Sequence, residues 1–282
     1  MKKLFLFLAI NITVCSHSQN SKLEYGLYNI GLGGFVGGFG ALINKTDKDK
    51  PLKTFTNGFL KGSLGGGFIQ VSKLCVGEIS ISNNYSYSWL AKINNSFGTS
   101  IVENATMNKP IFSKFHINIL GFNRIELHIE KSFKLKYKLM PLAFLMNSYV
   151  ATKSKFEWNK IIKTGEMVFS SNKISDNSYR AFTLGTTIVM NSNFLDNKST
   201  FSHELIHVYQ YYDYNFINSL INRPINNLTS KSEFISKLDF LYYDLQYPFL
   251  LTIYSLEKSK DKYYDNFFEK EAGIFSNTLR DY

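Results

Sequence analysis

The chain has few of the residues that cross-link an exported protein. It contains only two cysteines, Cys15 and Cys75, among 282 residues. Cys15 lies in an N-terminal segment that we expect to be removed, so the mature protein would hold a single thiol and no internal disulfide. Cys75 stands between two apolar neighbours, which is typical of a small buried residue. The fold must therefore be stabilised by its core alone.

Proline and acidic residues are scarce as well. The 5 prolines form no linker, and no repeat of fixed period is present. The chain has 32 Lys and Arg against 22 Asp and Glu, a net charge of +10. This excess favours an acidic partner, such as an anionic membrane surface or a cell-wall polymer. Because no nucleic-acid-binding module is recognisable, nucleic acid is not an expected partner.

Apolar side chains are plentiful by contrast. Hydrophobic residues make up 44% of the chain and aromatic residues 16%, which excludes an intrinsically disordered protein. The length of 282 residues is enough for one large domain or two small ones.

Residues 1–18 have the pattern of a secretory signal peptide. Lys2 and Lys3 precede an apolar run at 4–14, and small residues follow at the spacing that signal peptidase requires. We expect cleavage before Gln19, which removes two lysines and lowers the net charge from +10 to +8. The sequence therefore predicts an exported protein, located in the periplasm, in the cell envelope or outside the cell.

A glycine-rich N-terminal region follows at 19–110. Between 26 and 43 there are 18 residues without a charge, 7 of them glycines. Pairs such as Gly33 and Gly37 would lie on one face of a helix, where a second backbone can approach closely. Eighteen residues is also about the shortest span of a bilayer. Since glycine lowers helix stability, we expect tightly packed turns or small helices inside a soluble domain, with membrane contact through 26–43 as the alternative.

The region 111–195 shows the alternation of β-strands. Apolar and charged residues alternate in 124–130 and again in 133–139. A three-residue loop would pair Leu127 with Leu135, whereas a two-residue loop would set apolar residues against lysines. We expect the apolar face of this hairpin to be buried and the charged face to contact water. Further strands are predicted at 114–120 and 184–191.

The pattern becomes helical after residue 199. A period of 3.6 residues runs through 234–245 until Pro248 interrupts it, and a last helix is predicted at 262–275. A β-rich middle followed by helices predicts an α+β fold. We expect one domain at 111–282, with its β part at 111–195 and its helical part at 199–282.

The motif that carries chemistry is H-E-L-I-H at 203–207. Histidines four apart on a helix are separated by about 40° around the axis and about 6 Å along it, so His203 and His207 can bind one metal ion. Glu204 projects about 100° from His203, beside the ion, where it can accept a proton from a water. Gln210 and Tyr214 share the face of the histidines, and we expect them to contact a ligand or the substrate.

This motif resembles the zincin metallopeptidases, whose hallmark is an H-E-x-x-H helix. The resemblance covers the motif helix and the order of elements, and it points to no single named family. It implies a Zn²⁺ ion on His203 and His207, with Glu204 as the general base. It also implies that a strand before the helix forms the edge along which an extended peptide substrate lies. The segment 184–191 is placed for that role.

The third metal ligand separates the branches of the zincins. No histidine follows His207, so a downstream ligand must be a carboxylate. The metzincin pattern requires a glycine and a ligand where this chain has Gln210 and Asp213, and no methionine follows Met190 to form a Met-turn. These departures argue against that branch.

Gluzincins take their third ligand from a glutamate on a later helix, often followed by alanine. The sequence F-E-K-E-A at 268–272 fits. Glu271 lies amid the apolar face of the predicted helix, and Glu269 lies about 160° away among polar residues. A buried carboxylate needs a compensating cation such as Zn²⁺, so Glu271 is the predicted third ligand. The open alternatives are Glu233, Glu257 and Asp213.

The sequence therefore predicts an exported zinc metallopeptidase. A zinc-activated water that loses its proton to Glu204 would attack a peptide carbonyl. Two alternatives stay open. An outer-membrane or other envelope protein is favoured by the 18 Tyr, the 25 Phe and the glycine clusters. The other alternative is a zinc-binding protein without catalysis.

Overall fold

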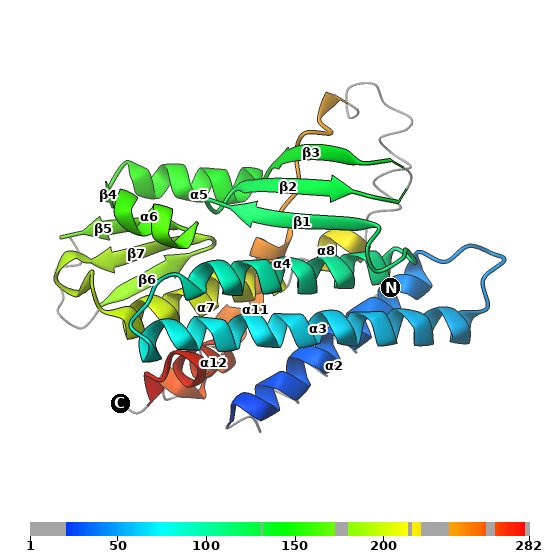
Figure 1. Ribbon diagram of the computed structural model, residues 1–282, viewed down its shortest axis with the longest axis horizontal. Coiled ribbons are helices and arrows are strands. Elements are labelled where there is room, and N and C mark those ends of the chain that lie inside the picture. Colours follow the sequence, from blue (N-terminus) through cyan, green and yellow to red (C-terminus); the bar gives the residue numbers. More distant parts are fainter. Residues whose placement is uncertain are drawn as a thin grey trace.

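A computed structural model describes residues 21–130, 132–172, 180–213, 216–220, 237–257 and 263–279. The predicted signal peptide lies outside these residues. Three long helices form one layer of the molecule, and two small sheets with shorter helices lie against it (Figure 1). This mixture of helices and sheets confirms the predicted α+β class.

The glycine-rich region forms long helices, so the expected turns or small helices are wrong. They are α2 (Lys22–Ile43), α3 (Pro51–Ile81) and α4 (Tyr87–Thr106). The three backbones approach closely at glycines, as the spacing predicted. A Cβ added to Gly62 of α3 would lie 2.0 Å from the carbonyl oxygen of Gly33 on α2, and one added to Gly65 would lie 2.7 Å from that of Gly98 on α4. Close interhelical packing compensates for the low helix propensity of glycine.

An antiparallel three-stranded sheet covers α4. It consists of β1 (Lys114–Ile119), β2 (Asn123–His128) and β3 (Lys134–Leu139), in that spatial order. Leu127 pairs with Leu135, which confirms the predicted register of the hairpin.

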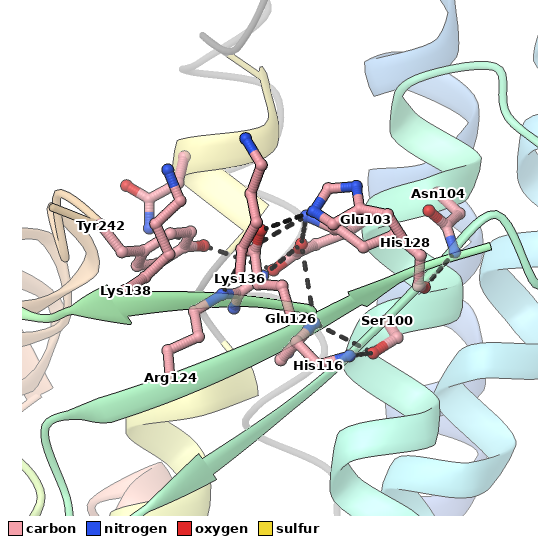
Figure 2. Close-up of polar contacts among 12 residues, drawn as sticks. Ser100, Glu103, Asn104, His116, Arg124, Glu126, His128, Lys136, Lys138 and Tyr242 are labelled. Atoms are coloured by element: carbon pink, nitrogen blue, oxygen red, sulfur yellow. Dashed lines mark hydrogen bonds and ion pairs between the residues drawn. The ribbon is translucent and has the colours of Figure 1, made fainter. Parts of the chain in front are cut away.

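The prediction that the apolar face of this hairpin is buried is wrong. Arg124 and Glu126 are buried, whereas Phe133 is 78% exposed and Leu135 is 69% exposed. The polar face is turned inward because α4 places the carboxylate of Glu103 against it. Glu103 accepts hydrogen bonds of 2.8 Å from both Arg124 and Lys114, and Arg124 donates to Glu126 at 2.7 Å. Figure 2 shows Glu103, Arg124 and Glu126 of this group gathered between the sheet and the helix. Two carboxylates and two cations compensate one another there, as buried charges require.

A neutral histidine completes this buried cluster. His116 of β1 lies between the hydroxyls of Ser100, at 2.9 Å, and Thr99, at 3.1 Å. Burial, together with the nearby guanidinium of Arg124, lowers the pKa of His116 to about 3. The imidazole therefore adds no charge to the interior near neutral pH.

The second sheet has four strands in the order β4-β5-β7-β6. These strands are β4 (Lys155–Phe156), β5 (Met167–Ser171), β6 (Ala181–Leu184) and β7 (Thr187–Asn191). The segment 184–191 was expected to form the edge strand, and this is wrong. The chain reverses at Gly185, whose φ of +62° favours glycine, so β7 lies inside the sheet and β6 forms its edge.

Two layers of helices enclose this sheet. Ile188 and Met190 on one face pack in the same core as Leu205 of α7 (Lys198–Asp213). Phe169 and Val189 on the other face pack with Val150 of α5 (Pro141–Ala151). This alternation buries both faces of the central strands and fixes α7 against the sheet.

The remaining helices are short. They are α6 (Trp158–Thr164), α8 (Phe216–Leu220), α11 (Gln246–Glu257) and α12 (Phe267–Ser276), with the 3-10 turns η1 (Ser192–Phe194) and η2 (Tyr263–Asp265). The helix predicted at 234–245 falls partly outside the described residues, and its described part is mostly turn. The helix instead begins at Gln246, because a proline in the first turn removes no helical hydrogen bond. The predicted last helix is confirmed as α12, and Cys75 is half-buried beside the core.

The glycine crossing gives a direct test of the packing. We expect Gly62→Ala to lower the free energy of unfolding by about 1–3 kcal/mol, because the new methyl group meets the backbone of α2. Gly67→Ala is the matched control, since an added Cβ there meets nothing within 4 Å. That variant should be more stable by about 0.5–1 kcal/mol. Urea unfolding of both variants measures the difference, and equal effects would contradict the close crossing.

Candidate metal centre

The motif helix α7 presents its two histidines to the start of α12. His203 and His207 lie one turn apart and are joined there by Glu269. The Nε2 atoms of the histidines are 3.3 Å apart. The Oε2 atom of Glu269 lies 3.1 Å from Nε2 of His203 and 3.3 Å from Nε2 of His207. Three ligand atoms thus converge on one point.

This triangle fits a tetrahedral zinc ion. Zinc binds nitrogen and oxygen at about 2.0–2.1 Å, so neighbouring ligand atoms around a tetrahedral ion are separated by about 3.3–3.4 Å. The sides of the triangle, 3.1, 3.3 and 3.3 Å, are close to that spacing. Two imidazoles and one carboxylate are also a donor set that zinc favours. The residues present therefore suit the metal that the motif implies.

Polar partners orient both imidazoles for this task. The Nδ1 atom of His207 lies 2.8 Å from Oε1 of Gln210, and that of His203 lies 3.2 Å from the hydroxyl of Thr278. An amide oxygen can only accept, so Nδ1 of His207 donates and its Nε2 lone pair points to the centre of the triangle in the neutral ring. The predicted contact of Gln210 with a ligand is therefore present.

Glu271 is not part of the triangle, so the predicted third ligand is wrong. Its carboxylate lies 2.7 Å from Nζ of Lys73 on α3 and accepts a 2.8 Å hydrogen bond from Nε2 of Gln210. The prediction was right that a buried Glu271 needs a cation, but a lysine supplies it. Glu269 reaches the histidines from the first turn of α12, which begins after the cap residue Asn266.

The remaining residues that the sequence analysis named for the site do not lie at the triangle or fall outside the described residues. Asp213 forms a 2.7 Å ion pair with Lys73. Glu257 is buried near the backbone nitrogen of Phe267. Glu233 and Tyr214 lie outside the described residues.

Glu204 lies beside the triangle, as the helical spacing predicted. One of its carboxylate oxygens lies 2.7 Å from the hydroxyl of Thr183 on β6. Glu204, His207 and Glu269 all line a cavity of about 310 Å³. The rest of its wall is largely apolar and comes from β6, α11, η2 and α12. Apolar wall residues include Phe182, Leu184, Tyr247, Leu250, Leu251 and Phe268.

Two phenols that the sequence analysis missed stand at the same cavity. The hydroxyl of Tyr254 donates to Oε1 of Glu269 at 2.8 Å, and that of Tyr263 lies 3.5 Å from Nε2 of His203. Burial and the charge of Glu269 raise the pKa of both phenols well above the usual range, so both keep their protons. No sequence signal singled out these tyrosines among the 18 of the chain.

The metal-free triangle attracts a proton. Burial alone would lower the pKa of His207, but the charge of Glu269 and their hydrogen bond outweigh it and raise this pKa to about 9. Burial likewise acts to raise the pKa of Glu269, and the two histidines reverse this and hold it far below its usual value. A proton therefore occupies the place that a cation would take.

Comparison with protein-family models, curated proteins and solved structures found no match to this chain.

Paired glutamine variants test which carboxylate binds metal. We expect Glu269→Gln to weaken zinc binding far more than Glu271→Gln, because only Glu269 reaches the triangle. Glu271 supports His207 through Gln210, and loss of such a support typically weakens metal binding about 10–100-fold. Competition with a chromophoric chelator measures both affinities. A larger loss in Glu271→Gln would restore the original ligand assignment.

The raised pKa of His207 predicts a pH dependence that metal reverses. In metal-free protein this group stabilises the fold below its unfolded pKa of about 6.5, and that contribution is lost as the pH rises through about 9. With zinc the free energy of unfolding should instead rise with pH, since protons compete with metal. Urea unfolding between these pH values, with chelator and with zinc, measures both slopes. Slopes of the same sign would contradict a metal site at His207.

Proposed function

We propose that this chain is an exported, zinc-dependent metallopeptidase with a zincin-like catalytic part. The observation that carries the proposal is the triangle of His203, His207 and Glu269, with Glu204 next to it in a cavity. A metal site without catalysis would not require an additional buried carboxylate in the wall of that cavity. Glu204 is such a group: it lines the same cavity and accepts a hydrogen bond of 2.7 Å from the hydroxyl of Thr183.

Each residue of the site has a part in peptide hydrolysis. Bound zinc would lower the pKa of a water and polarise the substrate carbonyl. Glu204 accepts the proton of that water and passes it to the leaving amine. The 2.7 Å hydrogen bond from Thr183 holds one carboxylate oxygen of Glu204, so the other could accept the proton.

The edge strand β6 suits an extended peptide. Among the described residues, β6 pairs with a strand on one side only, and the same strand lines the cavity. A peptide added to its other side would run past Glu204 and place side chains on alternate faces. The apolar wall around Leu250 and Leu251 favours a substrate with an apolar side chain at the cleavage site.

The two phenols supply donors for the reacting carbonyl. Tyr254 and Tyr263 are protonated and lie beside the carboxylate and imidazole of the triangle. A donor that strengthens its hydrogen bond as negative charge develops on the carbonyl oxygen lowers the barrier. Tyr263 is our candidate for this role, because its ring also lies parallel to that of His203 at 6.5 Å.

The test is a pair of charge-removing variants in the zinc-loaded protein. We expect Glu204→Gln to keep about one zinc per chain and to lower cleavage of a peptide library by at least 100-fold, in the range general-base catalysis provides. Glu130→Gln is the matched control at a half-exposed position of the β2–β3 loop. It should keep both zinc and activity.

Two results would overturn the proposal. One is purified protein that takes up no zinc, and the other is full peptide cleavage by Glu204→Gln. Zinc uptake without cleavage by the wild type would favour the metal-binding protein without catalysis.

A further inference from the structure

The layer formed by α2, α3 and α4 buries many polar side chains and exposes many large apolar ones. Its buried positions carry glycine, serine, asparagine and the charged residues Lys73, Lys92 and Glu103, beside apolar residues such as Val36 and Ile69. Its outward positions carry leucine, isoleucine and phenylalanine. Leu27 of α2 and Leu60 of α3 are each 63% exposed. A helix layer that faces water normally has the opposite arrangement.

Large exposed apolar residues recur along both helices, and we call each set a stripe. On α2 three of them recur at three- or four-residue spacing and so share one face, and two more follow at five and eight residues. The α2 stripe contains Leu23, Leu27, Ile30, Phe35 and Ile43. On α3 the spacings are four, seven, three and seven residues, which keep the side chains on one face of the helix. The α3 stripe contains Leu60, Leu64, Val71, Leu74 and Ile81.

A cluster of four phenylalanines joins the two stripes. Phe35 packs edge-on against Phe59 with ring centroids 5.5 Å apart, and Phe39 packs against Phe55 at 5.3 Å. These rings lie over Gly34 and Gly38, where an added Cβ would come within 3 Å of them. Phe35 nevertheless stays exposed, so the cluster belongs to the surface rather than to the core.

Exposed charge is missing from the same surface. After Glu24, α2 has no charged residue up to its end. Between Lys61 and Glu78 the only charged residue of α3 is Lys73, which is buried. Over this stretch the outer surface of the helix pair therefore carries no exposed charge that could pair with a charged partner.

Length and flanking charge indicate what covers this surface. By length and composition α2 could cross a membrane; its 22 residues extend about 33 Å, close to the hydrocarbon thickness of about 30 Å. Four lysines stand at the α2–α3 turn, at 45, 48, 50 and 53, against two aspartates. Basic residues next to an apolar surface bind anionic lipid headgroups.

We propose that the outer surface of α2 and α3 binds a phospholipid bilayer, with the basic α2–α3 turn at the headgroups. The close glycine packing and the buried polar groups of this layer are features of helices that contact lipid. The inference is independent of the metal centre, because none of its residues belongs to α7 or α12.

Site-specific fluorescent labels test the proposal in the purified full chain. With both native cysteines replaced by serine, Leu27→Cys and Leu64→Cys each carry an environment-sensitive dye. The vesicles contain equal parts of phosphatidylethanolamine and phosphatidylglycerol. We expect both dyes to shift to the blue on vesicle addition and to be quenched by spin-labelled lipid acyl chains. Labels at these positions report lipid contact by α2 and α3 themselves, so insertion of the apolar segment 4–14 into the vesicles would not produce the same signal.

Leu135→Cys is the matched control, since this leucine is also exposed and its strand β3 lies on the other side of the molecule from α2 and α3 (Figure 1). Its dye should remain in water. The proposal is overturned if the dye on either helix stays in water, or if the dye at 135 enters lipid equally. A blue-shifted dye in a soluble dimer without vesicles would also overturn it, in favour of a second copy of the chain.

Charge substitution provides a second measurement. The double variant Leu60→Glu/Leu64→Glu should lower the vesicle-bound fraction at least tenfold, whereas Leu135→Glu should leave it unchanged. Circular dichroism shows whether each variant is folded. Unchanged vesicle binding by the folded double variant would contradict the proposal.

Discussion

The buried ammonium of Lys73 is the interaction on which the helical part of the structure depends. It lies 2.7 Å from Asp213 of α7 and 2.7 Å from Glu271 of α12, so three helices meet at one cation. Burial raises the pKa of Asp213 to about 6 even beside the lysine, which shows how strongly this acid needs the cation. Removing one partner of such a group typically costs about 3–5 kcal/mol. Through Gln210, the same group also fixes the ring of His207.

Buried charge also explains the inverted polarity of the molecule. The sheet formed by β1–β3 turns Arg124 and Glu126 inward, where Arg124 forms an ion pair with Glu103 of α4. Helix α3 turns Lys73 inward, where it forms ion pairs with one acid on α7 and one on α12. Once polar side chains occupy the interior positions, the alternating or helical pattern forces apolar side chains outward. Leu135 of β3 and the exposed leucines of α3 lie on the faces turned away from these buried charges.

This inversion marks the limit of what the sequence could predict. The histidine motif, the α+β class and the pairing of Leu127 with Leu135 depend on local spacing, and spacing is visible in a sequence. The buried face of the hairpin depends on what α4 presents to it, which spacing does not encode. The apolar surroundings of Glu271 correctly predict that its carboxylate needs a cation, but they do not show which cation it is. Lys73 is the only charged residue between 62 and 77, a glycine-rich stretch. Its isolation could have indicated a buried lysine that pairs with Glu271, so that Glu269 is the acid beside the histidines.

Helix α3 connects the two proposals, because one face of it carries Lys73 and the other carries the apolar stripe. The cavity at Glu204 is lined from β6, α7, α11, η2 and α12, and by no residue of α2 or α3. The surface proposed to bind a bilayer and the site proposed to bind a peptide are therefore built from different helices and strands. Attachment through α2 and α3 would restrict where the proposed peptidase acts without involving any residue that lines the cavity.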